Sequence, residues 1–133
     1  MRFEDLKVSV GEVKFSTVRF DMADYFEAVF SRESFEMMTN ILKNLFGSPI
    51  WPSDSGKLSN DIKRALEDFG GVRIGQILYF WQKDDTAVFA MLWPWQDDHN
   101  ITLKIGSVRL RRSMKKNIQG DFLNIIKSFL KMR

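Results

Sequence analysis

The stretch that decides the fold is ILYFWQKDDTAVFAMLW, residues 77–93, in which a short polar segment separates two apolar ones. Asp84 and Asp85 form a natural two-residue turn, and a turn of that length fixes the register of the strands on either side. Side chains alternate between the two faces of a strand, so the register also fixes which residues share a face. The stretch therefore predicts an antiparallel hairpin.

A third strand is expected at residues 101–110, after a loop at residues 96–99. In this register Leu92 pairs with Leu103, and Ala90 pairs with Ile105. One face of the resulting three-stranded meander is apolar at every position. Its members are Ile77, Tyr79, Trp81, Val88, Ala90, Leu92, Ile101, Leu103 and Ile105. We expect this face to line the core, because an unbroken apolar face argues that the register is correct.

The opposite face of the meander mixes aromatic and polar residues. It consists of Ile74, Gln76, Leu78, Phe80, Gln82, Phe89, Met91, Trp93, Trp95, Thr102 and Lys104. One interpretation is that the N-terminal strands or a helix cover it, because large aromatic side chains are mostly buried. The other is a patch that binds a protein partner or a second copy of the chain. The residues predicted for that patch are Phe80, Phe89, Met91, Trp93 and Trp95, next to Lys104.

The remaining elements follow from hydrophobic periodicity. Short alternating bursts at Val8/Val10, Val13/Phe15, Val18/Phe20 and Phe26/Ala28/Phe30 predict two or three strands, broken at Gly11 and at residues 21–24. Apolar residues spaced by three and four predict central helices over residues 35–46 and 58–69 and a C-terminal helix over residues 114–129. The alternative is that Gly120 interrupts the last helix, which then begins at Asp121. Between the central helices lies a loop rich in Gly, Pro and Ser, which Trp51 is placed to anchor.

Together these elements predict one α+β domain over residues 1–133. It contains an antiparallel sheet built from an N-terminal hairpin and a three-stranded C-terminal meander, two central helices and one C-terminal helix. The sequence leaves open whether the hairpin and the meander form one sheet or two.

Composition excludes several classes of function. The chain has 44% hydrophobic and 28% charged residues and no cysteine, which argues against disorder and excludes disulfides and thiolate chemistry. The first ten residues contain no apolar segment of the kind found in signal peptides, and no apolar run is long enough to cross a membrane. We therefore expect a cytoplasmic protein without a membrane partner.

The stretch LWPWQDDHN, residues 92–100, contains His99, the one histidine of the chain. Asp97 and Asp98 adjoin it, but Asx-rich turns bind their own backbone, which explains these residues without any ligand. No nucleophile motif, phosphate-binding loop or metal-binding motif is present. We expect no catalytic residue, no metal site and no cofactor, and hence not an enzyme.

The net charge of +3 conceals an asymmetry between the two parts of the chain. Residues 104–133 hold nine basic residues and one acidic residue, whereas residues 1–103 hold eleven basic and sixteen acidic residues. Five of the cations gather where the last strand meets the last predicted helix. They are Arg109, Arg111, Arg112, Lys115 and Lys116. Either this segment binds an anion such as nucleic acid, or it packs beside the acidic body.

The sequence thus favours a small non-catalytic binding protein, of the adaptor, inhibitor or immunity type. It would engage a protein partner or itself through the aromatic face of the sheet. The alternative is a nucleic-acid-binding protein that uses the basic residues at 109–116.

Overall fold

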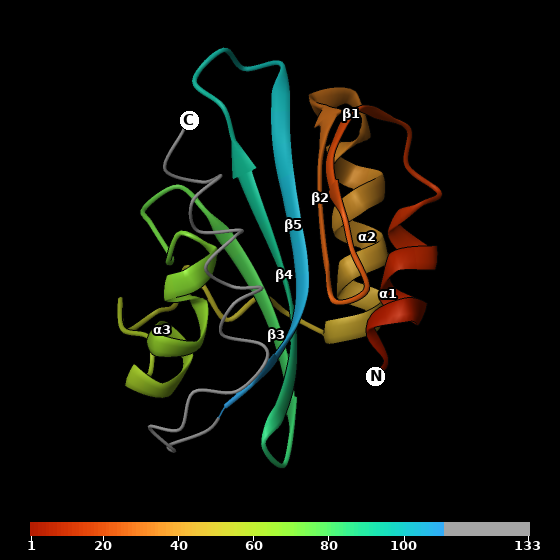
Figure 1. Ribbon diagram of the computed structural model, residues 1–133. Helices are drawn as coiled ribbons and strands as arrows, with labels where there is room; N and C mark the ends of the chain where they lie inside the picture. Colours follow the sequence, from red (N-terminus) through yellow and green to blue (C-terminus); the bar gives the residue numbers. More distant parts are fainter. Residues whose placement is uncertain (111–133) are drawn as a thin grey trace.

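The computed structural model describes residues 1–110, which form a five-stranded antiparallel sheet with helices on both faces (Figure 1). In chain order the elements are α1 (Phe3–Val10), β1 (Phe15–Asp21), β2 (Tyr25–Ser31), the 3-10 turn η1 (Arg32–Ser34), α2 (Phe35–Phe46), α3 (Asn60–Leu66), the 3-10 turn η2 (Glu67–Phe69), β3 (Ile77–Lys83), β4 (Thr86–Pro94) and β5 (Asn100–Arg109). The strand order is β1-β2-β5-β4-β3. The predicted α+β class is therefore confirmed.

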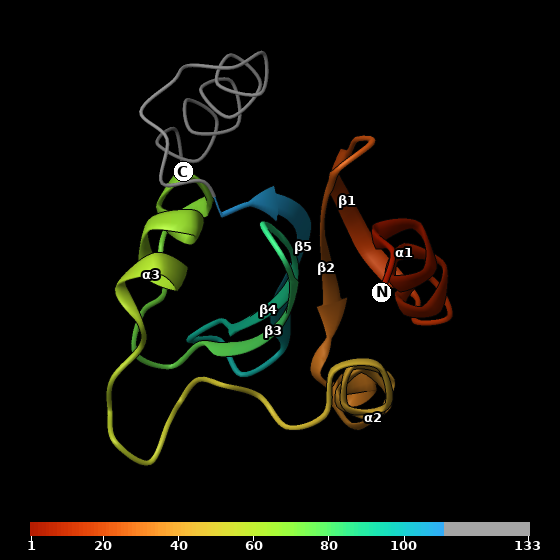
Figure 2. The same ribbon diagram turned by 90° about the horizontal axis from the view of Figure 1, so that it is seen from below.

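The hairpin and the meander belong to one sheet, because β2 pairs with β5 along its whole length. Helices α1 and α2 lie on one side of this sheet and α3 lies on the other (Figure 2). We call the side of α1 and α2 the first face and the side of α3 the second face. The predicted C-terminal helix falls outside the described residues.

The register predicted for the meander is confirmed. Lys83 pairs with Thr86, as the turn at residues 84 and 85 requires. On the other side of β4, Leu92 pairs with Leu103. Asp84 has a φ of 56°, a left-handed conformation that aspartate tolerates better than most residues. The turn residues thus set the register, and the register sets the two faces.

The prediction of a strand at Val8 and Val10 is wrong, because this segment forms α1. Phe3, Leu6 and Val10 are its buried residues, at spacings of three and four. Val8 points outward and is 75% exposed. Acidic residues in the first turn and a lysine in the last turn complement the helix dipole. The alternation of Val8 and Val10 was coincidental, since only one of the two residues faces the core.

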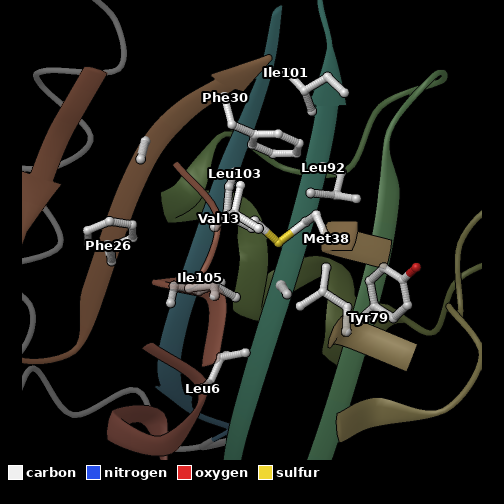
Figure 3. Packing of buried hydrophobic residues seen from close by; sticks show 14 of the residues in the cluster. Leu6, Val13, Phe26, Phe30, Met38, Tyr79, Leu92, Ile101, Leu103 and Ile105 are labelled. Carbon is white, nitrogen blue, oxygen red and sulfur yellow. The ribbon is translucent and has the colours of Figure 1, made fainter. Parts of the chain in front are cut away.

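The first face carries the predicted core (Figure 3). Its buried cluster contains residues of α1, α2 and the strands β2, β3, β4 and β5. Phe15 of β1 packs against this cluster. Figure 3 shows Leu6 of α1 and Met38 of α2 gathered with Leu92 and Leu103 of the sheet. The apolar face predicted for the meander is confirmed, with Ile77 and Trp81 partly buried at its margin.

The second face is covered in part by α3 and η2. Ser59 caps α3 by accepting a hydrogen bond from the Ile62 amide (3.3 Å), which places the start of the helix at Asn60, slightly later than predicted. Gly70 ends η2 with a φ of 97°. The Pro-rich loop before α3 is held at Trp51, which pairs with Leu78 at the edge of β3, as the sequence led us to expect.

Candidate functional site

The second face divides into a buried apolar half and a half that combines aromatic and charged side chains. In the apolar half, Phe69 of η2 packs on Tyr25 and on Phe89, with ring centroids 5.2 and 5.0 Å apart. The other buried members of this cluster are Leu66, Leu78, Ala87, Met91 and Val108. This half is a second core, and α3 is the element that closes it.

Phe89 and Met91, which the sequence placed in a partner-binding patch, belong to this second core. Both are fully buried, so in this structure neither can contact a partner. Phe80 is partly buried and packs against the same cluster. For Phe89 and Met91 the structure agrees with the alternative interpretation, in which a helix covers the face. The physical reason is that α3 packs on the mixed face with its own apolar side.

Trp93 and Trp95, at the end of β4, remain partly exposed. The indole N–H of Trp95 donates a hydrogen bond to the Thr102 hydroxyl (2.8 Å), so this ring lies over the neighbouring strand β5. Its backbone N–H donates to the Asn100 carbonyl (2.8 Å). Trp95 is nevertheless 37% exposed. The indole is thus held in position while part of its surface faces solvent.

Two arginines that the sequence analysis did not single out lie against these indoles. The Arg19 guanidinium lies 5.5 Å from the Trp95 ring centroid, and the Arg73 guanidinium lies 5.8 Å from that of Trp93. These distances are within the range of cation–π attraction. We call Arg19, Arg73, Trp93 and Trp95 the Trp–Arg surface.

The position of Arg19 depends on an irregularity in β1. Between Val18 and Phe20 the pairing of β1 with β2 shifts by one residue, and Arg19 is the residue left over. Such a bulge changes the direction of a side chain, and bulges are common next to functional sites.

The backbone of Arg73 is held by two hydrogen bonds. Its backbone carbonyl accepts from the Trp51 indole (3.3 Å), and its amide donates to the Gln76 side chain (2.7 Å).

Lys104 lies next to Trp93, as predicted, but it is buried. Its ammonium is 5.6 Å from the Trp93 ring centroid and donates a hydrogen bond to the Phe69 carbonyl (3.0 Å). Only 3% of the residue is exposed. Burial, with the positive charges of Arg73 and Arg19, lowers the pKa of Lys104 to about 8. Lys104 therefore ties the sheet to the end of η2 and lies behind the surface rather than on it.

The second face also contains Glu27, a fully buried carboxylate that the sequence analysis missed. One oxygen accepts a hydrogen bond from the Tyr25 hydroxyl (2.6 Å), and the other lies 3.5 Å from the Arg19 guanidinium. Glu27 is also the cross-strand partner of Lys104. A signal was present in the sequence, because a single acid interrupts the apolar run of residues 25–30.

The acidic turn after β4 is explained by its own hydrogen bonds. Asp97 accepts from the His99 amide (2.9 Å), the Asn100 amide (3.1 Å) and the Asn100 side chain (2.7 Å). These bonds, led by the one from the His99 amide, lower the pKa of Asp97. The predicted Asx turn is confirmed. Within residues 1–110 no group of three or more His, Asp or Glu side chains is placed to hold a metal ion.

Of the predicted basic junction, the structure describes only Arg109, which is exposed at the end of β5. Arg111, Arg112, Lys115 and Lys116 lie outside the described residues. None of the helices in the described part of the chain has the length and apolar character needed to cross a lipid bilayer. Comparisons of the chain with models of protein families, with curated proteins and with solved structures gave no match.

Proposed function

We propose that the chain is a non-catalytic binding protein that engages a protein partner, or a second copy of itself, through the Trp–Arg surface. The observation that carries this proposal is the pair of partly exposed indoles, each faced by an arginine guanidinium. Tryptophan, tyrosine and arginine are the residues most enriched at the energetic centres of protein interfaces.

The hydrogen bonds that hold residues of this surface in place favour a binding role. Trp95 is held by Thr102, and the backbone of Arg73 is held by Trp51 and Gln76. Side chains that are fixed before a partner arrives lose less conformational entropy on association. Ile74, which follows Arg73 in the chain, is 95% exposed and offers an apolar side chain to a partner.

The polar groups of the second face support a binding role over a catalytic one. Glu27 is engaged by Tyr25 and Arg19, and the Lys104 ammonium is bonded to a backbone carbonyl. A general acid or base must reach a substrate proton, whereas these groups are buried in contacts within the chain.

Site-specific crosslinking tests this proposal. A photoreactive amino acid at position 74, beside the Trp–Arg surface, is expected to give a discrete adduct in the cells that make the protein. The same amino acid at position 8, exposed on α1 on the first face, is the matched control and is expected to give no such adduct. Mass spectrometry then identifies the adduct as another protein or as a second copy of this chain.

Support requires that the complex be rebuilt from purified components. We expect the double variant Trp93→Ala, Trp95→Ala to bind the identified partner at least tenfold more weakly than the parent, with circular dichroism confirming that it is folded. For self-association, sedimentation velocity of the parent and of the double variant gives the same comparison. Equal adducts at positions 74 and 8, or a complex that tolerates the double variant, would contradict the proposal.

Nucleic-acid binding through the basic residues at 109–116 is the second candidate. The observation that favours it is that residues 104–133 contain nine basic residues and only one acidic residue. It predicts an affinity for single-stranded DNA that falls steeply with salt, with a log–log slope of about −0.7 for each phosphate contacted. Fluorescence anisotropy of a labelled oligonucleotide measures this slope. The double variant Arg111→Ala, Arg112→Ala should make this slope less steep. Absence of binding at low salt would exclude this candidate.

A further inference from the structure

We propose that the Trp–Arg surface recognises a carboxylate group on an acidic segment of the protein partner, held between Arg19 and Arg73. This inference rests on the proposed function and names the chemistry of the partner. The carboxylate would accept hydrogen bonds from the guanidinium groups, while the two indoles contact the apolar parts of the same segment.

The charge balance of the site carries the first step. Three cations, Arg19, Arg73 and Lys104, lie against the two indoles, and Glu27 is the carboxylate placed among them. Glu27 is fully buried and already bound to Tyr25, so it is not available to Arg73. Burial lowers the pKa of Lys104 most, and the nearby positive charges of Arg73 and Arg19 lower it further. A bound anion would relieve this repulsion.

Arg73 carries the second step. It is exposed, and among residues 1–110 no carboxylate lies within ion-pair distance of it. A guanidinium over an aromatic ring still presents the N–H groups at its edge, and these match a carboxylate in a two-point hydrogen bond. Trp51 and Gln76 fix the backbone of Arg73, and its guanidinium lies over the Trp93 ring, so both contacts favour this position before a ligand arrives.

The small number of cations at the site favours a single carboxylate or a short acidic segment over an extended polyanion. The two arginines face one indole each, and Arg19 is already paired with Glu27. A short segment with one or two acidic side chains would contact the cationic region alone.

Nuclear magnetic resonance on the full chain tests the inference. The probe is the blocked peptide Gly-Glu-Glu-Gly, and its control is the blocked peptide Gly-Gln-Gln-Gly at the same ionic strength. We expect the glutamate peptide to shift the indole N–H signals of Trp93 and Trp95 saturably, and the glutamine peptide to leave them in place. Single Trp→Phe variants assign the four indole signals.

Variants of the arginines separate this site from general charge attraction. Arg73→Gln is expected to weaken binding of the glutamate peptide at least fivefold. Arg2→Gln removes the same charge from an exposed position before α1, on the first face, and should leave the affinity unchanged. Arg19→Lys keeps a positive charge beside the buried Glu27 but removes the planar N–H groups. This variant should therefore also weaken binding of the glutamate peptide. Dispersed backbone signals confirm that each variant is folded.

Three results would overturn the inference. They are equal shifts with the glutamine peptide, no shift with either peptide, and inorganic phosphate binding to the same indoles at least tenfold more tightly than the glutamate peptide. The last result would point to a phosphate group instead. Because the crosslinking experiment at position 74 does not depend on charge, it can still identify a partner when the peptide fails. The two proposals therefore fail separately.

Discussion

Gly106→Val is expected to lower the free energy of unfolding by about 3 kcal/mol, the upper part of the range for overpacking a core. Gly106 lies in β5, directly between Tyr25 of β2 and Phe89 of β4. A Cβ atom at this position would lie 2.7 Å from Cε1 and 2.9 Å from Cζ of Phe89. These distances are shorter than any ordinary van der Waals contact, so the phenylalanine ring would have to move.

The ring has little room to retreat, because Phe69 packs on Phe89 from above and on Tyr25 beside it. A smaller side chain at position 89 removes this obstacle. In a Phe89→Leu background we expect Gly106→Val to cost less than about 1 kcal/mol, a coupling energy of about 2 kcal/mol between the two sites. Urea unfolding of the four proteins in this cycle measures the coupling. Additive effects would show that Phe89 does not occupy the space above Gly106.

The second large effect is a rise in stability with pH that depends on Lys104. Burial lowers the pKa of this amine to about 8 in the folded protein, from 10.5 for an unperturbed lysine. Below pH 8 the amine is protonated in both states, and the folded state bears the full cost of burying the charge. Between pH 8 and 10.5 the folded protein has lost this proton while the unfolded chain still holds it. The free energy of unfolding therefore increases with pH in this window.

From pH 7 to pH 10 we expect this gain to reach about 2 kcal/mol. Measurements should stop there, because burial raises the pKa of Tyr79 and ionisation of its hydroxyl opposes folding at higher pH. In Lys104→Met the rise should disappear. Lys63→Met, which removes an exposed lysine of α3, is the matched control and should keep it. A stability that falls from pH 8 to 10 in the parent, or an unchanged rise in Lys104→Met, would contradict the assignment.

Local rules predicted the meander well because the two turns are short. The turn at Asp84 and Asp85 and the loop before Asn100 leave few ways to pair the strands, so each predicted pair was found. The N-terminal segment failed for the opposite reason. In a helix of only eight residues, three buried positions are too few to outweigh a chance alternation such as that of Val8 and Val10.

The candidate site was predicted only in part. Trp93, Trp95 and Lys104 share one face because the pleat places them there, and the sequence alone reveals that pattern. Whether a residue on this face is exposed depends on where α3 docks. That docking buries Phe89 and Met91, and the hydrophobic periodicity of α3 does not specify which face of the sheet the helix will cover.

By itself, therefore, the sequence determined the register of the meander, the apolar first face and the self-bonded turn at Asp97, because each follows from contacts between residues near in the chain. The tertiary structure decided which aromatic residues remain accessible and which charges surround them. Arg19 of β1 and Arg73 of a loop reach the indoles, and Glu27 of β2 pairs with Arg19. The strand order and a bulge in β1 bring these residues together. Contacts between such distant segments depend on the packing of the whole molecule, and no local pattern encodes them.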